Sequence, residues 1–149
     1  MSLNFGASIP FVNLLGFTLE KFDGGESEMH FEVLPQYMNT YQVAHGGAVM
    51  TLMDVSMATA ARSLRLDSGV VTIEMKTSFM RPGLPGATGK LVAKGRVVHH
   101  TKSMAFVESH IYNGDGDLCA QGSGTFRYVN RNDGVVFNGA GKPVDPPTD

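Results

Sequence analysis

The chain has 149 residues, of which 42% are hydrophobic and 17% charged, and its formal net charge is −2. These values predict one globular domain with a sizeable core, and the weak charge gives no reason to expect nucleic acid or an acidic membrane surface as a partner. One cysteine excludes an internal disulfide and fits a reducing compartment. Without a signal-peptide pattern or an apolar run of roughly 20 residues, we expect a cytoplasmic protein that does not enter the membrane.

The N-terminal part of the chain predicts a short helix and then a β-hairpin. Residues 9–16 have a proline near their start and a glycine at their end, as short helices do. Residues 17–22 and 26–34 flank Asp23-Gly24-Gly25, a sequence typical of a tight turn. In the second strand apolar side chains alternate with charged ones, so one face should be buried.

A loop over residues 35–44 leads into a nearly all-apolar helix predicted for residues 46–66. Between Gly46 and Ala61, Asp54 is the only charged residue. A helix that is apolar on every side belongs inside a protein, and a buried carboxylate is costly unless it is paired or used. Asp54 is therefore the first place to look for function.

The remainder of the chain predicts four strands joined by tight turns. In the first strand the apolar or small side chains at odd positions from Val71 to Phe79 alternate with polar ones. Consecutive hairpins form an antiparallel sheet whose buried face must be covered, and the central helix is the one element long enough. We expect an α+β domain over residues 1–130, a sheet wrapped around one helix. Residues 131–149 have little periodicity and predict a poorly ordered tail. The four strands are expected near residues 71–79, 88–99, 102–113 and 118–128.

The segment around the start of the central helix carries a specific motif. Asn39, His45-Gly46-Gly47 and Asp54 are followed by a strand that opens Val-Val-Thr72-Ile and ends Met-Arg81-Pro. With this spacing and strand order, residues 10–130 resemble the hotdog-fold acyl-CoA thioesterases. The resemblance is greatest to the phenylacetate-pathway (PaaI-like) and acyl-CoA thioesterase 13-like branch.

The resemblance implies hydrolysis of an aryl or medium-chain acyl-CoA to a carboxylic acid and CoA, with no cofactor besides the CoA of the substrate. Asp54 would act as nucleophile or general base, and the amide of Gly46 would polarise the thioester carbonyl. Asn39 and His45 would position the reacting groups, and Thr72 would orient water. The family also implies a homodimer, commonly a dimer of dimers.

The chemistry of the reaction agrees with these roles. A negative oxygen forms on the thioester carbonyl during attack, and a helix N-terminus offers free N–H groups and a partial positive charge. Glycine at positions 46 and 47 lets the substrate approach the backbone. Asp54 can attack directly or take a proton from water, and the sequence does not choose between these routes.

A distance argument predicts that the site is shared between two chains. Eight positions separate Gly46 from Asp54, which is about 12 Å along a helix. A nucleophile must come within roughly 3–3.5 Å of the carbonyl carbon. One helix cannot place both groups at one carbonyl, but two antiparallel copies in an isologous dimer can.

Other residues are predicted to bind the CoA part of the substrate or to line its acyl pocket. Gly47, Arg81 and the turn His100-Thr101-Lys102 offer amides or cationic groups for the CoA phosphates. Apolar side chains around residues 48–64 and 75–80 should line the acyl pocket. The five histidines lack metal-ligand spacing, so no metal is expected. Cys119 has no evident histidine partner and should be inert.

The sequence leaves structural and functional alternatives open. His45 could simply cap the helix, Asn39 could build its loop, and Thr72 could pack within its strand. A non-catalytic acyl-CoA binding protein would not need Asp54. A hotdog hydratase or dehydratase would need an acid–base pair across the β-carbon of the acyl group, whereas the glycine pair and mid-helix aspartate follow the thioesterase pattern. Acyl-carrier protein could replace CoA.

Overall fold

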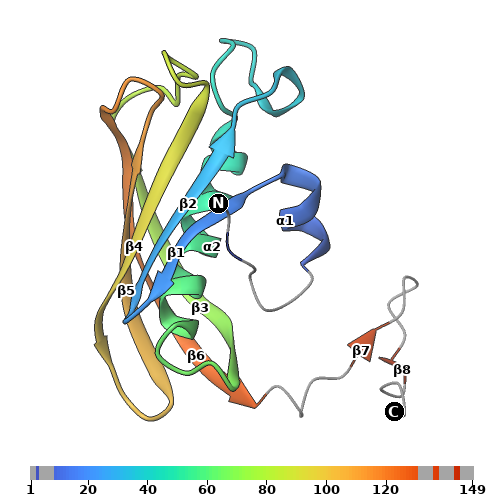
Figure 1. The fold of residues 1–149 in the computed structure, drawn as a ribbon, viewed down its shortest axis with the longest axis vertical. Helices are drawn as coiled ribbons and strands as arrows, with labels where there is room; N and C mark the ends of the chain where they lie inside the picture. The colour runs from blue at the N-terminus through green and yellow to red at the C-terminus, as the bar shows by residue number, and fades with distance from the viewer. Residues whose placement is uncertain (1–2, 4–8, 131–135, 138–142, 145–149) are drawn as a thin grey trace.

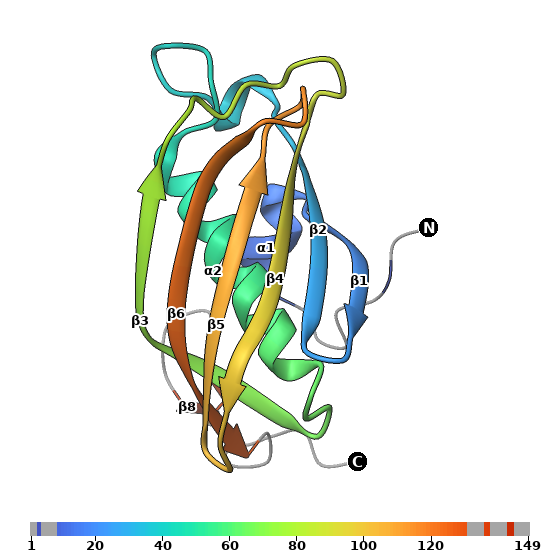
Figure 2. The ribbon, with the colours of Figure 1, turned by 90° about the vertical axis from the view of Figure 1, so that its left-hand side faces the viewer.

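The protein forms a six-stranded antiparallel sheet with two helices on one face (Figures 1 and 2). This computed structural model describes residue 3 and residues 9–130, 136–137 and 143–144. The predicted α+β class, with one long helix against an antiparallel sheet, is confirmed. In chain order the elements are α1 (Pro10–Leu15), β1 (Thr18–Asp23), β2 (Glu26–Glu32), the 3₁₀ helix η1 (Pro35–Tyr37), α2 (Gly46–Arg62), β3 (Ser68–Phe79), β4 (Lys90–His100), β5 (Met104–Tyr112), β6 (Leu118–Asn130), β7 (Val136–Phe137) and β8 (Pro143–Val144).

The strand order is β1-β2-β4-β5-β6-β3, so β3 lies at the edge of the sheet beside β6. The expectation that β3 and β4 are joined by a tight turn is therefore wrong. Residues 80–89 instead cross the end of the sheet, because Pro82 and Pro85 lack the N–H groups that a hairpin ladder requires. The crossing segment is fixed by the Gly83 carbonyl, which accepts from Ala44 N, and by the Leu84 carbonyl, which accepts from Gly114 N.

Helix α2 packs closely on the sheet because small residues occupy the strands beneath it. A Cβ atom at Gly95 would lie 2.6 Å from the carbonyl oxygen of Ser56, so only glycine leaves room for the helix backbone. The buried hydroxyls at this contact are satisfied: Ser27 Oγ donates to the Ser56 carbonyl at 2.6 Å, and the Ser56 and Ser109 hydroxyls lie 2.7 Å apart. The largest buried side chains around them are Phe31, Phe126, Leu19, Met29, Leu52, Met53, Met57, Leu91 and Ile111.

Helix α2 ends at Arg62, four residues earlier than the sequence pattern predicts. Ser63 stops it, because its hydroxyl donates to the Ala60 carbonyl at 2.7 Å and accepts from Gly25 N at 2.7 Å. The helix end is thereby tied to the β1–β2 turn.

One side of α2 is left uncovered by its own chain. Met50 is exposed, and Asp54, Val55 and Ala58 are only partly buried, although most of this stripe is apolar. The neighbouring edge strand β3 is also open. The side chains of Val71 and Ile73 on β3 are 46% and 53% exposed. A helix that is apolar all round is thus only half enclosed within a single chain.

A bulge in β3 changes which side chains face the helix. The pairing of β3 with β6 shifts between Thr72 and Glu74. Thr72 contacts Asp54 of α2, and Phe79 lies against the start of the same helix, although seven positions separate them. Strict alternation would put these two residues on opposite faces, so the predicted uninterrupted alternation of β3 is wrong at the bulge.

The C-terminal part contributes one short antiparallel pair, β7 with β8. The rest of the predicted tail, residues 131–149, lies outside the described residues, and the proposed boundary at residue 130 stays a prediction. Across the ranges that the structure describes, no helix combines the length and apolar character needed to span a bilayer.

Candidate active site

The first turn of α2 is capped by the side chain of His45. Its Nδ1 atom accepts a hydrogen bond from Gly47 N at 2.9 Å. His45 therefore does cap the helix, as the structural alternative predicted. This cap has a chemical consequence. Because Nδ1 is the acceptor, the proton of the neutral imidazole is on Nε2, where it can be donated to another group. The Gly47 amide is used by His45, which leaves Gly46 as the candidate oxyanion donor.

Asn39 organises the loop that precedes the helix. Its side-chain oxygen Oδ1 accepts from Tyr41 N at 2.9 Å and from Val43 N at 3.4 Å, while its backbone N–H donates to the Val43 carbonyl. The loop includes Gln42 in the left-handed conformation, with φ of 60°. Within the described residues no hydrogen bond is made by the Nδ2 group of Asn39, which lines the cavity beside Gly46.

Asp54 and Thr72 form a second group of site residues. The Thr72 hydroxyl donates to Asp54 Oδ1 at 2.7 Å. In the single chain, Asp54 is partly buried and Thr72 is exposed. Thr72 reaches the carboxylate because of the β3 bulge, and its hydroxyl occupies one of the two carboxylate oxygens.

The structure does not bring the two groups together within one chain. Asn39, His45 and Gly46 gather at the start of α2, whereas Asp54 and Thr72 lie two helical turns further along. At 1.5 Å per residue, that separation is about 12 Å. Asp54 also faces the uncovered side of the helix.

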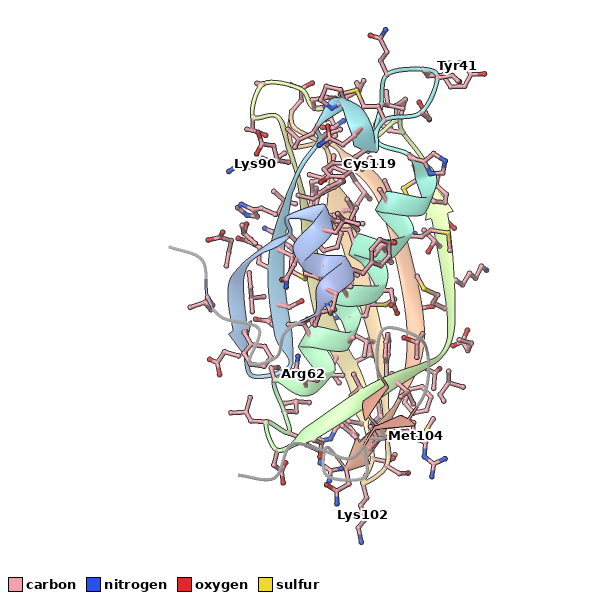
Figure 3. All side chains as sticks on the ribbon, turned by 90° about the vertical axis from the view of Figure 1, so that its right-hand side faces the viewer. Tyr41, Arg62, Lys90, Lys102, Met104 and Cys119 are labelled. Carbon is pink, nitrogen blue, oxygen red and sulfur yellow. The ribbon has the colours of Figure 1, made fainter. Side chains whose placement is uncertain are left out.

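The residues predicted to bind CoA are likewise divided between two places. Arg81 lies near the start of α2, and its Nη1 donates to the Leu118 carbonyl at 3.1 Å. The turn containing Lys102 lies at the opposite end of the molecule from Tyr41 (Figure 3). The Lys102 carbonyl accepts a hydrogen bond from the guanidinium of Arg65, which ties this turn to the segment that follows α2. Thr101 Oγ1 accepts from Met104 N at 3.0 Å and helps to shape the turn.

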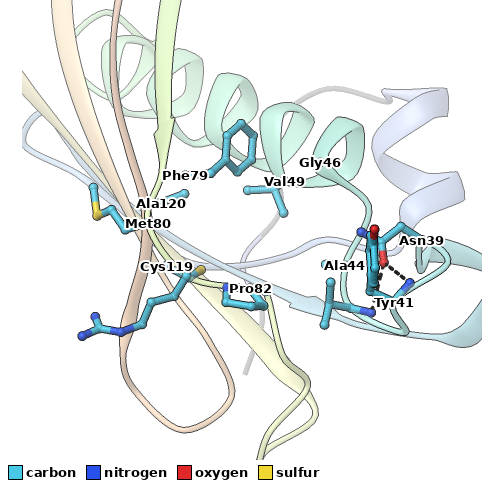
Figure 4. Close-up of a pocket in the computed structure, with 13 residues that line it drawn as sticks. Asn39, Tyr41, Ala44, Gly46, Val49, Phe79, Met80, Pro82, Cys119 and Ala120 are labelled. Atoms are coloured by element: carbon cyan, nitrogen blue, oxygen red, sulfur yellow. Dashed lines mark hydrogen bonds between the residues drawn. The ribbon is translucent and has the colours of Figure 1, made fainter.

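A cavity of about 550 Å³ opens beside Gly46 (Figure 4). Its walls come from three distant segments: the loop and first turn of α2, the chain after β3, and the start of β6. Its lining is mainly apolar, and of the residues 48–64 and 75–80 predicted to line an acyl pocket it includes Val49, Phe79 and Met80. The residues that line it are Asn39, Tyr41, Val43, Ala44, Gly46, Val49, Phe79, Met80, Arg81, Pro82, Gly83, Cys119 and Ala120.

Two cavity residues are notable: Phe79, which belongs to the predicted lining range 75–80, and Cys119, which the sequence did not assign to a pocket. The ring of Phe79 reaches 3.9 Å from the position that a Cβ of Gly46 would occupy, so it borders the candidate oxyanion site. Cys119 is 1% exposed, and burial raises the pKa of its thiol. A protonated thiol is a poor nucleophile, so Cys119 acts as part of the lining. No local pattern marks Cys119 as a lining residue, because the cavity forms only when the segments assemble.

The described residues contain no cluster of three or more His, Cys, Asp or Glu side chains that could hold a metal ion.

One long helix packed against a six-stranded antiparallel sheet is the architecture of the hotdog fold, which the solved structures named below share. The chain belongs to the Thioesterase superfamily, whose family model matches residues 41–120. This family makes it a thioester hydrolase.

Individual relatives support the same assignment. The chain is 31% identical over 99 residues to the acyl-coenzyme A thioesterase PaaI of Escherichia coli, an alignment that covers 66% of this chain and 68% of PaaI. The solved structure of E. coli PaaI matches with a TM-score of 0.73 and 26% identity, covering 80% of this chain and 84% of PaaI. The conserved protein PA5202 from Pseudomonas aeruginosa matches with a TM-score of 0.76 and 30% identity, covering 83% and 97% of the two chains.

Proposed function

We propose that this protein hydrolyses acyl-CoA thioesters at a site completed by a second copy of the chain. The observation that carries the proposal is the separation of Asp54 and Thr72 from Gly46, together with the uncovered side of α2 that Asp54 faces. Membership of the thioesterase superfamily and similarity to a protein named acyl-coenzyme A thioesterase support the substrate class.

Two elements of the chain favour the same two-fold arrangement. If Asp54 faces the partner's Gly46, the two α2 helices are antiparallel and cross at Met50. On β3, Thr72 adjoins Asp54 and Phe79 adjoins Gly46. The two-fold axis that relates the two α2 helices therefore also puts Thr72 opposite the partner's Phe79. The open edges of the two β3 strands then run antiparallel beside one another. Pairing these edges satisfies their free backbone groups and covers the exposed apolar side chains.

In this arrangement the thioester carbonyl lies at the start of α2. The Gly46 amide and the helix dipole stabilise the negative oxygen, and the partner's Asp54 reacts at the carbonyl carbon. Either its carboxylate attacks, the C–S bond breaks and water hydrolyses the resulting anhydride, or it takes a proton from a water molecule that attacks. In both routes CoA leaves as the thiol. His45 Nε2–H and Asn39 Nδ2 position the reacting groups.

The two-fold arrangement also gives a place for the CoA phosphates. Because Gly46 then faces the partner's Asp54, the partner's Arg62, which ends α2 eight positions after Asp54, would lie about 12 Å beyond Gly46 along the helix direction. The partner's Arg65 follows three residues later. Arg65 holds the turn of His100, Thr101 and Lys102. That turn of the partner would lie just outside the mouth of the site, where the phosphates of a bound CoA would extend into solvent. Arg81 would lie closer to the cavity. Association of two dimers into a tetramer and a cytoplasmic location stay predictions.

A panel of acyl-CoA substrates tests the activity. Release of free thiol is expected. Hydration of an enoyl-CoA without thiol release would instead indicate a hydratase, and binding without turnover would indicate a binding protein; either result would refute the proposal.

Mixing two inactive variants tests the shared site. Asp54→Ala removes the acid, and Gly46→Leu blocks the oxyanion site. Their heterodimer contains one intact site, so equal mixing with random exchange should restore about a quarter of the wild-type activity. Mixing Asp54→Ala with Asp54→Asn is the control and should restore none. No recovery after verified subunit exchange would exclude a site built from two chains.

A further inference from the structure

The cavity beside Gly46 has an open end and a closed end. At the open end, Tyr41 on the loop is 82% exposed. At the other end, which we call the closed end, the lining residues Val49, Cys119 and Ala120 are buried in the core. Figure 4 shows Cys119 and Ala120 on the side of the cavity away from Asn39 and Tyr41.

The walls of this cavity are fixed by backbone hydrogen bonds. The Cys119 carbonyl accepts from Met80 N at 2.9 Å and from Arg81 N at 3.2 Å, which fastens the chain after β3 to the start of β6. Across the cavity, Ala44 N donates to the Gly83 carbonyl at 2.9 Å. A cavity braced on both sides keeps its size, because widening it would break these bonds.

If the proposed function holds, either the acyl group or the pantetheine arm of CoA enters this cavity from Gly46. The pantetheine arm carries two amide groups that need hydrogen-bond partners, and a nucleotide is attached to its far end. The closed end, lined by the buried side chains of Val49, Cys119 and Ala120, offers those amides neither a charged or amide side chain as partner nor a passage to solvent. The acyl group is apolar and, unlike the pantetheine arm, has no further group attached to its far end. It therefore fits the closed end of the cavity.

We infer that the cavity binds the acyl group and that the Cys119 side chain, at its closed end, sets the largest acyl group accepted. The inference rests on the proposed thioesterase function. Cys119 suits this position because a buried thiol behaves as a small apolar group. Its side chain can be shortened or lengthened without introducing charge.

The test compares kcat/KM across straight-chain acyl-CoAs from acetyl to palmitoyl for wild type, Cys119→Ala and Cys119→Met. Wild type should show a sharp upper limit of chain length. Cys119→Met should lower kcat/KM for the longest accepted chain by at least about tenfold relative to acetyl-CoA, and Cys119→Ala should shift the limit to longer chains. Val107→Ala is the matched control, because Val107 is buried in β5 but does not line the cavity. It should leave the chain-length profile unchanged.

The outcomes separate this inference from the proposed function. Absence of turnover by wild type on every acyl-CoA would overturn both. Turnover with equal effects of the Cys119 variants on all chain lengths would overturn the inference alone and would indicate that the pantetheine arm occupies the cavity. A flat wild-type profile up to palmitoyl would also overturn it, and that measurement does not depend on whether the variants fold.

Discussion

At the scale of single residues, the hydrogen bond between Thr72 and Asp54 gives the carboxylate a fixed orientation. One oxygen accepts from the hydroxyl at 2.7 Å, and under the proposed mechanism the other oxygen attacks the carbonyl or takes the proton. His45 has a comparable arrangement, since Gly47 N holds Nδ1 and leaves Nε2 to act. In both cases a neighbouring group uses one polar atom of the side chain, and under the proposed function the remaining atom faces the substrate.

Asp54→Asn should lower kcat by at least about 10² while leaving the fold and CoA binding largely intact. The amide has the same shape but cannot act as nucleophile or base. Steady-state kinetics and circular dichroism measure the two effects. Near-normal turnover would refute the catalytic role of Asp54.

Thr72→Val should lower kcat by about tenfold to a hundredfold, because it removes a charge-assisted hydrogen bond to the carboxylate while keeping the shape. Thr72→Ser keeps the hydroxyl and should retain most of the activity. If both variants behave alike, the hydroxyl has no part in positioning Asp54 and the role of Thr72 is packing alone.

At the scale of elements, local patterns predicted the helices and most strands, since burial of one face leaves a period in the sequence. The alternation in β2 is a clear case, with Met29 and Phe31 buried and Glu32 exposed. What the patterns missed depends on contacts between distant segments. The β3 bulge is set by pairing with β6, and the end of α2 is set by a bond from Ser63 to the β1–β2 turn.

The same division holds for the candidate site: residues marked by local sequence features could be predicted, and residues brought in by distant segments could not. Asp54 could be found from composition, because a lone charge in an apolar helix is conspicuous. The grouping of His45, Gly46 and Asn39 followed from their closeness in sequence. The cavity residues Phe79 and Cys119 could not be selected individually, because they meet Gly46 only through the sheet topology.

Gly95→Ala should lower the free energy of unfolding by about 1–3 kcal/mol, because its Cβ would lie 2.6 Å from the Ser56 carbonyl oxygen and force α2 away from the sheet. Urea unfolding measures the change. Val98→Ala, at an exposed position on the same strand, is the control and should change stability by less than about 0.5 kcal/mol. Equal effects of the two variants would mean that the helix does not depend on this close approach.

At the scale of the whole molecule, Tyr128 links the sheet to the end of α2, because its hydroxyl donates to the Ala61 carbonyl at 2.8 Å. Burial raises the pKa of Tyr128 above its ordinary value of 10.0, and burial likewise raises the pKa of Cys119 above 9.0. The folded state therefore favours the neutral form of both groups. Their contribution to stability is complete below the pKa values of the unfolded chain and is lost as the pH rises through the folded ones.

The free energy of unfolding should consequently fall as the pH rises above about 9, and Tyr128→Phe should make this fall less steep. Urea unfolding between neutral and alkaline pH gives the slope. Tyr41→Phe, at an exposed tyrosine, should reproduce the wild-type slope. An unaltered slope in Tyr128→Phe would show that this tyrosine has the same pKa in the folded and unfolded chains.

The open side of α2 has a consequence for how such an enzyme would behave in a cell. Under the shared-site proposal, a lone chain holds two half-sites and no complete one. Specific activity would then depend on the abundance of the protein itself and rise steeply where expression crosses the dissociation constant of the pair. Dilution below that dissociation constant would abolish the activity without any inhibitor and without unfolding of the chain.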